Sequence, residues 1–176
     1  DNGATTTQVL FLARLYAAAR DERFRAAAVR GIDFLLAAQY PNGGWPQFFP
    51  LRTDYSRHVT FNDDAMAHAM ELLDDVARGR SPFEWTDGPL RSRALAAFAA
   101  GIRCILASQV VVDGRRTAWC AQHDEVTLEP RPARRFEPVS LSGSESVGVV
   151  ELLMRVEDPA PDVVAAVDAA VAWFSA

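Results

Sequence analysis

Apolar residues recur every three or four positions along six stretches of this chain of 176 residues. This spacing is the period of a helix that buries one face, whereas a half-buried strand alternates apolar and polar positions. The pattern predicts helices over about 5–19, 21–38, 62–78, 89–109, 144–156 and 161–176. We therefore expect an all-α fold in a single domain that spans 1–176.

Three of the predicted helices contain similar segments at an almost constant spacing. Residues 29–32 (VRGI) align with 99–102 (AAGI), 70 positions later, and with 169–171 (AAV), 69 positions further on. Alanine-rich helices resemble each other by composition, but the even spacing favours a threefold repeat of helical hairpins. Three antiparallel hairpins wrapped in one direction form an (α/α)3 toroid, in which the ends of even helices and the starts of odd helices share one rim.

Two long connections, about 39–61 and 109–143, fall on that predicted rim. Long loops in a compact domain are usually functional or disordered, so we expect the active groove here. The first loop is aromatic where a solvated loop would be polar. Trp45 could stack on a sugar ring or could plug the end of the toroid. His58 could bond to substrate or to a backbone carbonyl.

Clusters of acidic, amide and hydroxyl side chains open the three odd-numbered helices, at 1–2 (DN), 62–64 (NDD) and 142–146 (SGSES). Capping of helix N-termini explains such residues, and we expect it for Ser142 and Ser144. The three polar residues 62–64 exceed what one cap needs. Carboxylates gathered from separate helix ends could hold Ca²⁺, with substrate oxygens or water completing its shell.

The second loop carries the densest cationic segment of the chain, formed by Arg131, Arg134 and Arg135. Such a run can be a solvated loop, or it can grip the carboxylates of an anionic polymer, because guanidinium matches carboxylate bidentately. Cys120 and His123 have the two-residue gap of some zinc sites. The chain has no second pair of this kind, so zinc is weakly indicated.

Composition excludes several classes of partner. The net charge is −5, and all 18 cationic residues are arginines scattered among acids, so nothing resembles the basic stripe of a nucleic-acid-binding protein. No apolar run approaches the roughly 20 residues of a membrane span, and no basic-then-apolar leader opens the chain, so a signal peptide is cleaved or absent. The two cysteines, Cys104 and Cys120, could pair or stay free.

Five ordered motifs resemble those of the family 10 pectate lyases and together cover nearly the whole chain. They are 1–6 (DNGATT), 40–47 (YPNGGWPQ), 57–64 (RHVTFNDD), 119–124 (WCAQHD) and 140–146 (SLSGSES). The resemblance implies an (α/α)3 toroid and a calcium-dependent anti β-elimination that cleaves polygalacturonate. Ca²⁺ is thus the expected cofactor and pectate the expected partner, with no nucleic acid and no membrane involved.

The resemblance also implies roles for individual residues. It places the catalytic arginine within 133–137 (ARRFE), where it favours Arg134, with Arg135 as the alternative base. Asp1 and Asp63 fall where the family has calcium-binding and active-centre acids. The remaining expected substrate contacts are Asn2, Trp45, Arg57, His58, Gln122 and Arg135.

The family continues beyond the sixth helix into a segment that this sequence does not match. We therefore expect 1–176 to be a portion of a catalytic module, truncated at its C-terminal end and monomeric. Because polymers do not easily enter cells, the suggested substrate favours a secreted or periplasmic location.

Two other function classes stay open. Gln39 followed by Gly43, Gly44 and Trp45 is similar to the Gln-Trp motifs of α-toroid terpene cyclases and prenyltransferases. The acidic run of the cyclases and a complete zinc set are absent from the sequence, however. The other class is a non-catalytic polysaccharide-binding remnant of a lyase module.

Overall fold

The computed structural model describes residues 3–176, and most of this length is helical. The described residues form α1 (Ala4–Ala19), α2 (Glu22–Ala38), α3 (Ala65–Arg78), α4 (Gly88–Ser108), α5 (Gly143–Met154) and α6 (Pro161–Phe174). The all-α prediction is confirmed, and each helix falls within a few residues of its predicted range. None of the described helices combines the length and apolar character needed to cross a membrane.

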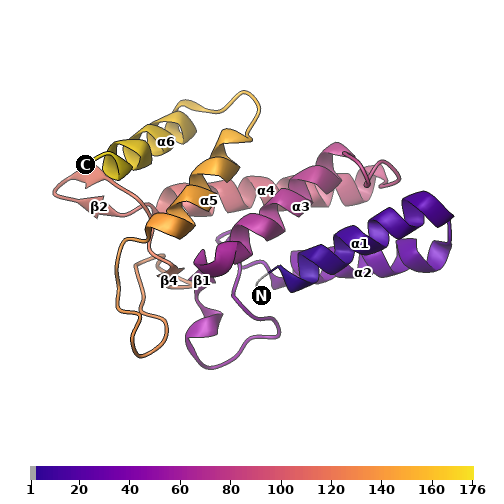
Figure 1. Cartoon of the computed structure of the whole chain (residues 1–176), viewed down its shortest axis with the longest axis horizontal. Helices are drawn as coiled ribbons and strands as arrows, with labels where there is room; N and C mark the ends of the chain where they lie inside the picture. The colour runs from indigo at the N-terminus through magenta and orange to yellow at the C-terminus, as the bar shows by residue number, and fades with distance from the viewer. Residues whose placement is uncertain (1–2) are drawn as a thin grey trace.

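The six helices pair into three consecutive hairpins, in which α1 packs on α2, α3 on α4 and α5 on α6. Contacts between α1, α3 and α5 form one layer, and contacts between α2, α4 and α6 form the other. Figure 1 shows the first and third hairpins at opposite ends of the second. The predicted hairpins and layers are confirmed, whereas closure of the hairpins into a ring stays a prediction.

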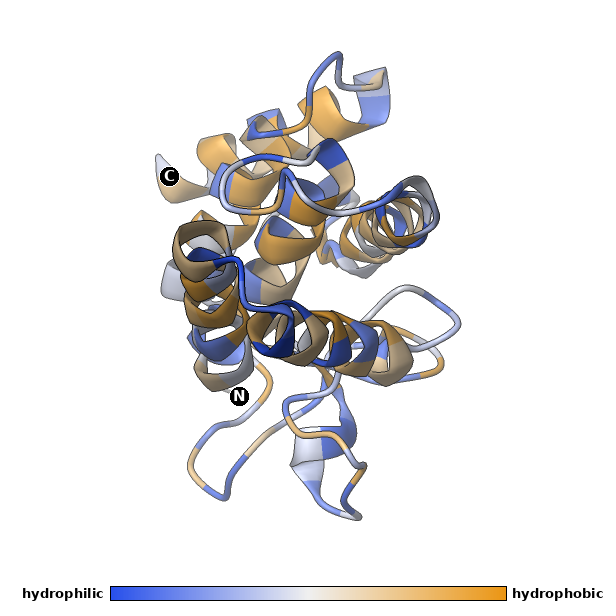
Figure 2. Cartoon of the chain, turned by 90° about the vertical axis from the view of Figure 1, so that its right-hand side faces the viewer, coloured by the Kyte–Doolittle hydropathy of each residue, from blue (hydrophilic) through white to orange (hydrophobic). Residues whose placement is uncertain are grey.

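The first long connection and the later part of the second hang from the same side of the molecule, whereas the early part of the second lies beside the C-terminus (Figure 1). The two connections contain two short antiparallel ladders: β1 (Val59–Thr60) pairs with β4 (Gln122–His123), and β2 (Val111–Val112) pairs with β3 (Arg115–Arg116). The first ladder ties one long connection to the other. In Figure 2 the hydrophobic residues concentrate where helices face one another, and the long loops carry hydrophobic stretches as well.

The glycines of the repeated segments lie at the closest approach within two hairpins. A Cβ atom on Gly31 of α2 would lie 2.3 Å from Cγ2 of Val9 on α1. A Cβ atom on Gly101 of α4 would lie 2.6 Å from the sulfur of Met70 on α3. Because real Cβ atoms do not approach other atoms so closely, a larger residue at either position would displace the side chain that packs against it. The match between 29–32 and 99–102 therefore reflects equivalent packing.

Two glutamines at the ends of even helices join each hairpin to the next. Gln39 Nε2 donates to the carbonyl of Ala97 on α4 at 2.9 Å, and Gln109 Nε2 donates to the carbonyl of Ala166 on α6 at the same distance. Each amide also donates to a carbonyl of the loop that follows it. The two donor residues are 70 positions apart and the two acceptor residues are 69 positions apart, which is the spacing of the sequence repeat.

Two tryptophans repeat in the same way. The indole N–H of Trp45 donates to the carbonyl of Leu35, and that of Trp119 donates to the carbonyl of Ile105, both at 2.8 Å. Both tryptophans are buried. The Gln-Trp pattern thus occurs twice in this chain, and its hydrogen bonds hold α2 and α4 to their loops. This structural role accounts for the likeness to α-toroid cyclases without a shared substrate.

Ion pairs hold the second and third hairpins together away from the long loops. Asp74 of α3 is 1% exposed and accepts from Arg78 Nε at 2.7 Å and from Arg80 Nη1 at 2.6 Å. The same two arginines pair with Glu157 in the turn between α5 and α6. A buried carboxylate is stable only when it is paired in this way.

We expect Asp74→Asn to lower the free energy of unfolding by about 2 kcal/mol, less than the roughly 3–5 kcal/mol of a fully buried pair, because the arginines are partly exposed. Urea unfolding measures the change. Glu22→Gln, which removes the exposed pair with Arg25, is the matched control and is expected to change stability by at most about 0.5 kcal/mol. Equal effects of the two substitutions would contradict the structural role of Asp74.

Candidate active site

A groove of about 310 Å³ opens among the long connections. It is lined by Asn62, by 120–122, by residues of the 131–140 segment, and by Ser142 and Glu145 at the start of α5. The middle and the later half of the chain therefore meet at one rim, as the sequence predicts.

Asp63 lies beside this groove in a turn of unusual backbone geometry. Asn62–Asp64 form the 3-10 turn η2, in which Asp63 and Asp64 both adopt left-handed backbone angles, with φ of 54° and 55°. Neither Phe61 nor Asp64, at the N-cap positions of η2 and α3, caps its helix with a side-chain hydrogen bond. Strained backbone of this kind concentrates at functional sites. The Asp63 carboxylate is exposed and accepts a hydrogen bond from the Asn62 amide.

Arg134 follows the groove-lining residue Ala133 and is held by Glu137, which also lines the groove. Its Nε donates to Glu137 Oε2 at 3.0 Å, its Nη2 donates to Oε1, and its backbone N–H donates to Oε2 at 3.1 Å. These bonds and the charge of Glu137 raise the pKa of Arg134, and the field of Asp63 adds to the effect. Asp63 and Arg134 are thus within electrostatic reach of each other.

Arg135, the alternative base, faces a different partner. Its guanidinium lies over the ring of Phe136, 5.5 Å from the ring centre. Phe136 itself is 87% exposed. Which of the two arginines acts as the base stays a prediction.

Arg57 and His58 are both engaged by Glu125. Arg57 Nε lies 2.6 Å from Glu125 Oε1, and His58 Nδ1 lies 2.8 Å from Oε2. Burial alone would raise the pKa of Glu125, but the hydrogen bond with His58 and the charge of Arg57 outweigh it and lower this pKa. The three side chains join the first long connection to the second. Any contact of Arg57 or His58 with substrate stays a prediction.

Ser142 occupies the N-cap position of α5 but does not cap the helix with its side chain. Its hydroxyl donates to the carboxylate of Glu145 instead. The expected cap is therefore wrong for Ser142. Both residues line the groove, so this hydroxyl and carboxylate add oxygen atoms to its wall.

The family model of the pectic acid lyases matches residues 1–176, the whole chain. The chain belongs to this family. Two solved structures of the family 10 polysaccharide lyase from Cellvibrio cellulosa are 42% identical to the chain and superpose with a TM-score of 0.96. One of them is an aspartate-to-alanine mutant in complex with trigalacturonic acid. No curated protein matches the chain.

Each of these two solved structures is longer than this pectic acid lyase family member. The match covers 100% of this chain and 55% of the chain in each structure. The predicted membership of polysaccharide lyase family 10 is confirmed.

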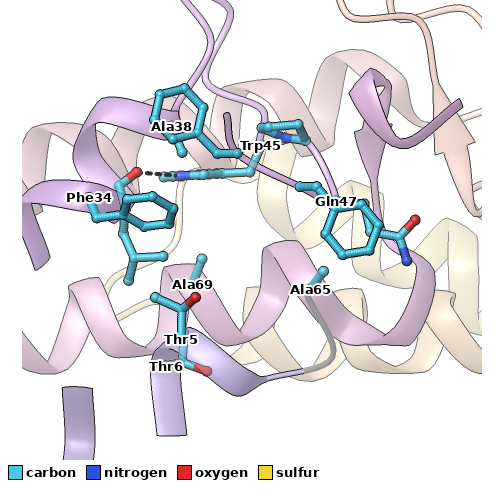
Figure 3. A pocket seen from close by; sticks show the side chains of 12 residues that line it. Thr5, Thr6, Phe34, Ala38, Trp45, Gln47, Ala65 and Ala69 are labelled. Carbon is cyan, nitrogen blue, oxygen red and sulfur yellow. Dashed lines mark hydrogen bonds between the residues drawn. The ribbon is translucent and has the colours of Figure 1, made fainter. Parts of the chain in front are cut away.

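Trp45 lies away from the groove, in a cleft of about 140 Å³ between α1, α2 and the first long connection. It is 3% exposed, and Figure 3 shows its indole ring turned inward, with the dashed bond to the carbonyl of Leu35. The Trp45 ring is therefore packed inside the fold, which was the alternative to stacking on a sugar ring. Its N–H already donates to a backbone carbonyl and is not available to a ligand.

The cysteines and His123 serve the fold. Cys104 and Cys120 are buried and free, and burial raises the pKa of Cys104 to about 12. Both ring nitrogens of His123 are engaged: Nε2 accepts from the backbone N–H of Cys120, and Nδ1 lies 2.9 Å from the carbonyl of Leu128. A zinc ion would have no free nitrogen to bind here, so the weak zinc interpretation is wrong.

The fit of calcium can be judged from the donors at the groove mouth. Asp63 and Asn62 offer oxygen atoms, which hard cations prefer. Among residues 3–176, however, no group of three or more histidine, cysteine or acidic side chains is placed to hold a metal. Ca²⁺ takes about six to eight oxygens. The donors therefore fit a site that is completed by other oxygens; Asp1 and Asn2, predicted to act there, lie outside the described residues.

Three residues of the site were not predicted as such: Glu125, Glu137 and Phe136. Glu137 had a local signal, because it follows Arg134 by three positions and carries the opposite charge. Glu125 binds Arg57 and His58 from 68 and 67 positions away, respectively, and no local pattern predicts such a contact.

Proposed function

We propose that this chain cleaves polygalacturonate by anti β-elimination, with Arg134 as the base and Asp63 as a ligand of Ca²⁺. One observation carries the proposal: Asn62, next to Asp63, and Ala133, next to Arg134, come from separate connections and line one groove. Membership of the pectic acid lyase family supports the reaction class. The trigalacturonic acid bound by the Cellvibrio mutant supports the substrate class.

The reaction removes the hydrogen on C5 of a uronate, which is barely acidic. When Ca²⁺ is bound to the C6 carboxylate, it withdraws the negative charge that develops as the proton leaves. Arg134 accepts the C5 proton, the C5–H electron pair forms the C4–C5 double bond, and the C4–O4 bond breaks. The departing oxygen then takes a proton from water.

Arg134 can act as a base only in its neutral form, which is scarce because the ordinary pKa of arginine lies above about 12. Glu137 raises this pKa further and so opposes catalysis at neutral pH. Cations bound nearby oppose the protonated form, and alkaline solution increases the neutral fraction. We therefore expect activity to rise with pH through the alkaline range.

Removing the Glu137 charge should shift this pH dependence. Because Glu137 raises the pKa of Arg134, Glu137→Gln is expected to move the rising limb of kcat/KM to lower pH. Initial rates between pH 7 and pH 11 measure the shift. Glu84→Gln, an exposed site between α3 and α4, is the matched control. An unmoved limb in Glu137→Gln would refute the effect of this ion pair.

The function itself is tested by incubating polygalacturonate with the protein, with and without calcium. We expect a new ultraviolet-absorbing double bond only when calcium is present. Binding of the polymer without this absorbance would favour a non-catalytic remnant. Absence of both would point to another substrate class. Because the substrate is a polymer found outside the cell, we also propose a secreted or periplasmic location.

A further inference from the structure

A buried glutamine amide without partners lines the groove floor. Gln122 is 1% exposed, and within the described part of the chain neither its Oε1 nor its Nε2 has a hydrogen-bond partner. Buried amides are almost always paired, with protein, ordered water or ligand, because leaving them unpaired is costly. The amide of Gln122 therefore has capacity for a polar group that enters the groove.

Backbone hydrogen bonds fix the position of Gln122, whereas its buried side-chain amide has no hydrogen-bond partner among the described residues. Gln122 pairs with Thr60 across the β1–β4 ladder, and its carbonyl accepts from the backbone N–H of Arg131 at 2.9 Å. Directly paired residues of a ladder point to the same face, and Thr60 Oγ1 is also buried without a partner. Three unpaired polar atoms thus lie on one face of a fixed strand pair.

Phe136 lines the same groove with an apolar surface. Its ring is 87% exposed, far more than most large apolar side chains of this protein. It follows Arg134 and Arg135 in the loop that carries the proposed base. An exposed aromatic ring beside a polar groove suits a ligand with one flat apolar face.

A pyranose ring combines these two kinds of surface, since it has an apolar C–H face and an edge of hydroxyl groups. The Gln122 amide both donates and accepts, which matches hydroxyls. A carboxylate only accepts, so it would pair with Nε2 and leave Oε1 without a partner. We propose that Gln122 and Phe136 form a subsite for one uronate ring, in which Gln122 recognises the O2 and O3 hydroxyls and Phe136 stacks on the C–H face. This inference rests on the proposed function, because it takes the galacturonate chain as ligand.

Binding of trigalacturonic acid in calcium-free buffer, followed by calorimetry, tests the subsite. Gln122→Met keeps the length of the side chain but removes its hydrogen bonds, and Phe136→Ala removes the ring. We expect each to weaken binding about tenfold and to raise KM similarly, with kcat within about twofold. Phe136→Tyr should bind as the wild type does. Val126→Ala, at an apolar residue 78% exposed outside the groove lining, is the matched control.

Pectate acetylated at O2 or O3 gives a second readout that a structural role would not change. The wild type is expected to prefer the unacetylated polymer, and Gln122→Met should lose most of this preference. If Gln122→Met does not fold, Phe136→Ala decides alone, because an exposed ring can be removed without harm to the core.

The outcomes separate this inference from the proposed function. Unchanged Kd and KM in Phe136→Ala, or in a folded Gln122→Met, overturn the subsite even if the wild type is a lyase. Loss of binding in these variants supports the subsite even if the wild type forms no unsaturated product, and in that case the lyase proposal alone fails.

Discussion

Arg134→Ala is expected to lower kcat/KM on polygalacturonate by about a thousandfold, within the range of roughly 10²–10⁴ that a general base contributes. Arg134→Lys should lose most of the activity as well, because an ammonium keeps the charge but lacks the planar fork that Glu137 holds. The rate of formation of the unsaturated product, with calcium present, measures both effects.

The fold should survive these substitutions, since the Arg134 side chain is 64% exposed and its ion pair is local. Unchanged melting temperatures would confirm this. Arg116→Ala, in the exposed strand β3, is the matched control and should keep full activity. If Arg134→Ala were fully active and Arg135→Ala inactive, the base would be Arg135.

Asp63→Asn is expected to lower kcat/KM by about a hundredfold and to raise the calcium concentration needed for half-maximal activity, because Ca²⁺ affinity depends on the number of charged ligands. Asparagine tolerates the left-handed backbone of this position, so the change tests the charge and not the turn. Titration of initial rates with calcium, after removal of metal with a chelator, measures the shift.

Asp113→Asn is the matched control for this substitution. Asp113 is also exposed and left-handed, with φ of 50°, but it lies in the turn between β2 and β3. Its replacement should leave the calcium dependence unchanged. Equal calcium dependence in Asp63→Asn and the wild type would remove Asp63 from the proposed metal site.

The helices could be predicted because their period is a local property of the sequence. The start that differs most is that of α3, which was expected at about 62 and begins at Ala65. Asp63 and Asp64 adopt left-handed angles that no apolar periodicity reveals. This difference lies at the proposed calcium-binding turn, and functional sites are where a chain departs from the local conformational preferences of its sequence.

The repeat was only partly recognised from the sequence. The glycines at 31 and 101 were aligned correctly, but the second Gln-Trp pair, Gln109 and Trp119, was overlooked. The loop between this glutamine and its tryptophan is longer than the first and carries the β2–β3 hairpin. The equivalent burial and hydrogen bonds of Trp45 and Trp119 indicate a structural role for both indole rings.

The side-chain partners of the site could not be predicted to the same extent. Which groups Arg57 and His58 contact depends on Glu125, which the fold brings from the other long connection. Arginines of the cationic segment also differ in partner: Arg131 pairs with Asp124, and Arg134 with Glu137. Composition shows a basic loop, but only the folded chain decides which carboxylate each guanidinium meets.

The most direct test of the account is a crystal structure of the Arg134→Lys variant with Ca²⁺ and trigalacturonic acid. We predict that Ca²⁺ contacts both the Asp63 carboxylate and a uronate carboxylate, with residue 134 facing C5 of the sugar in the groove that Gln122 lines. A sugar bound instead in the cleft beside Trp45, or a calcium ion remote from Asp63, would contradict the account.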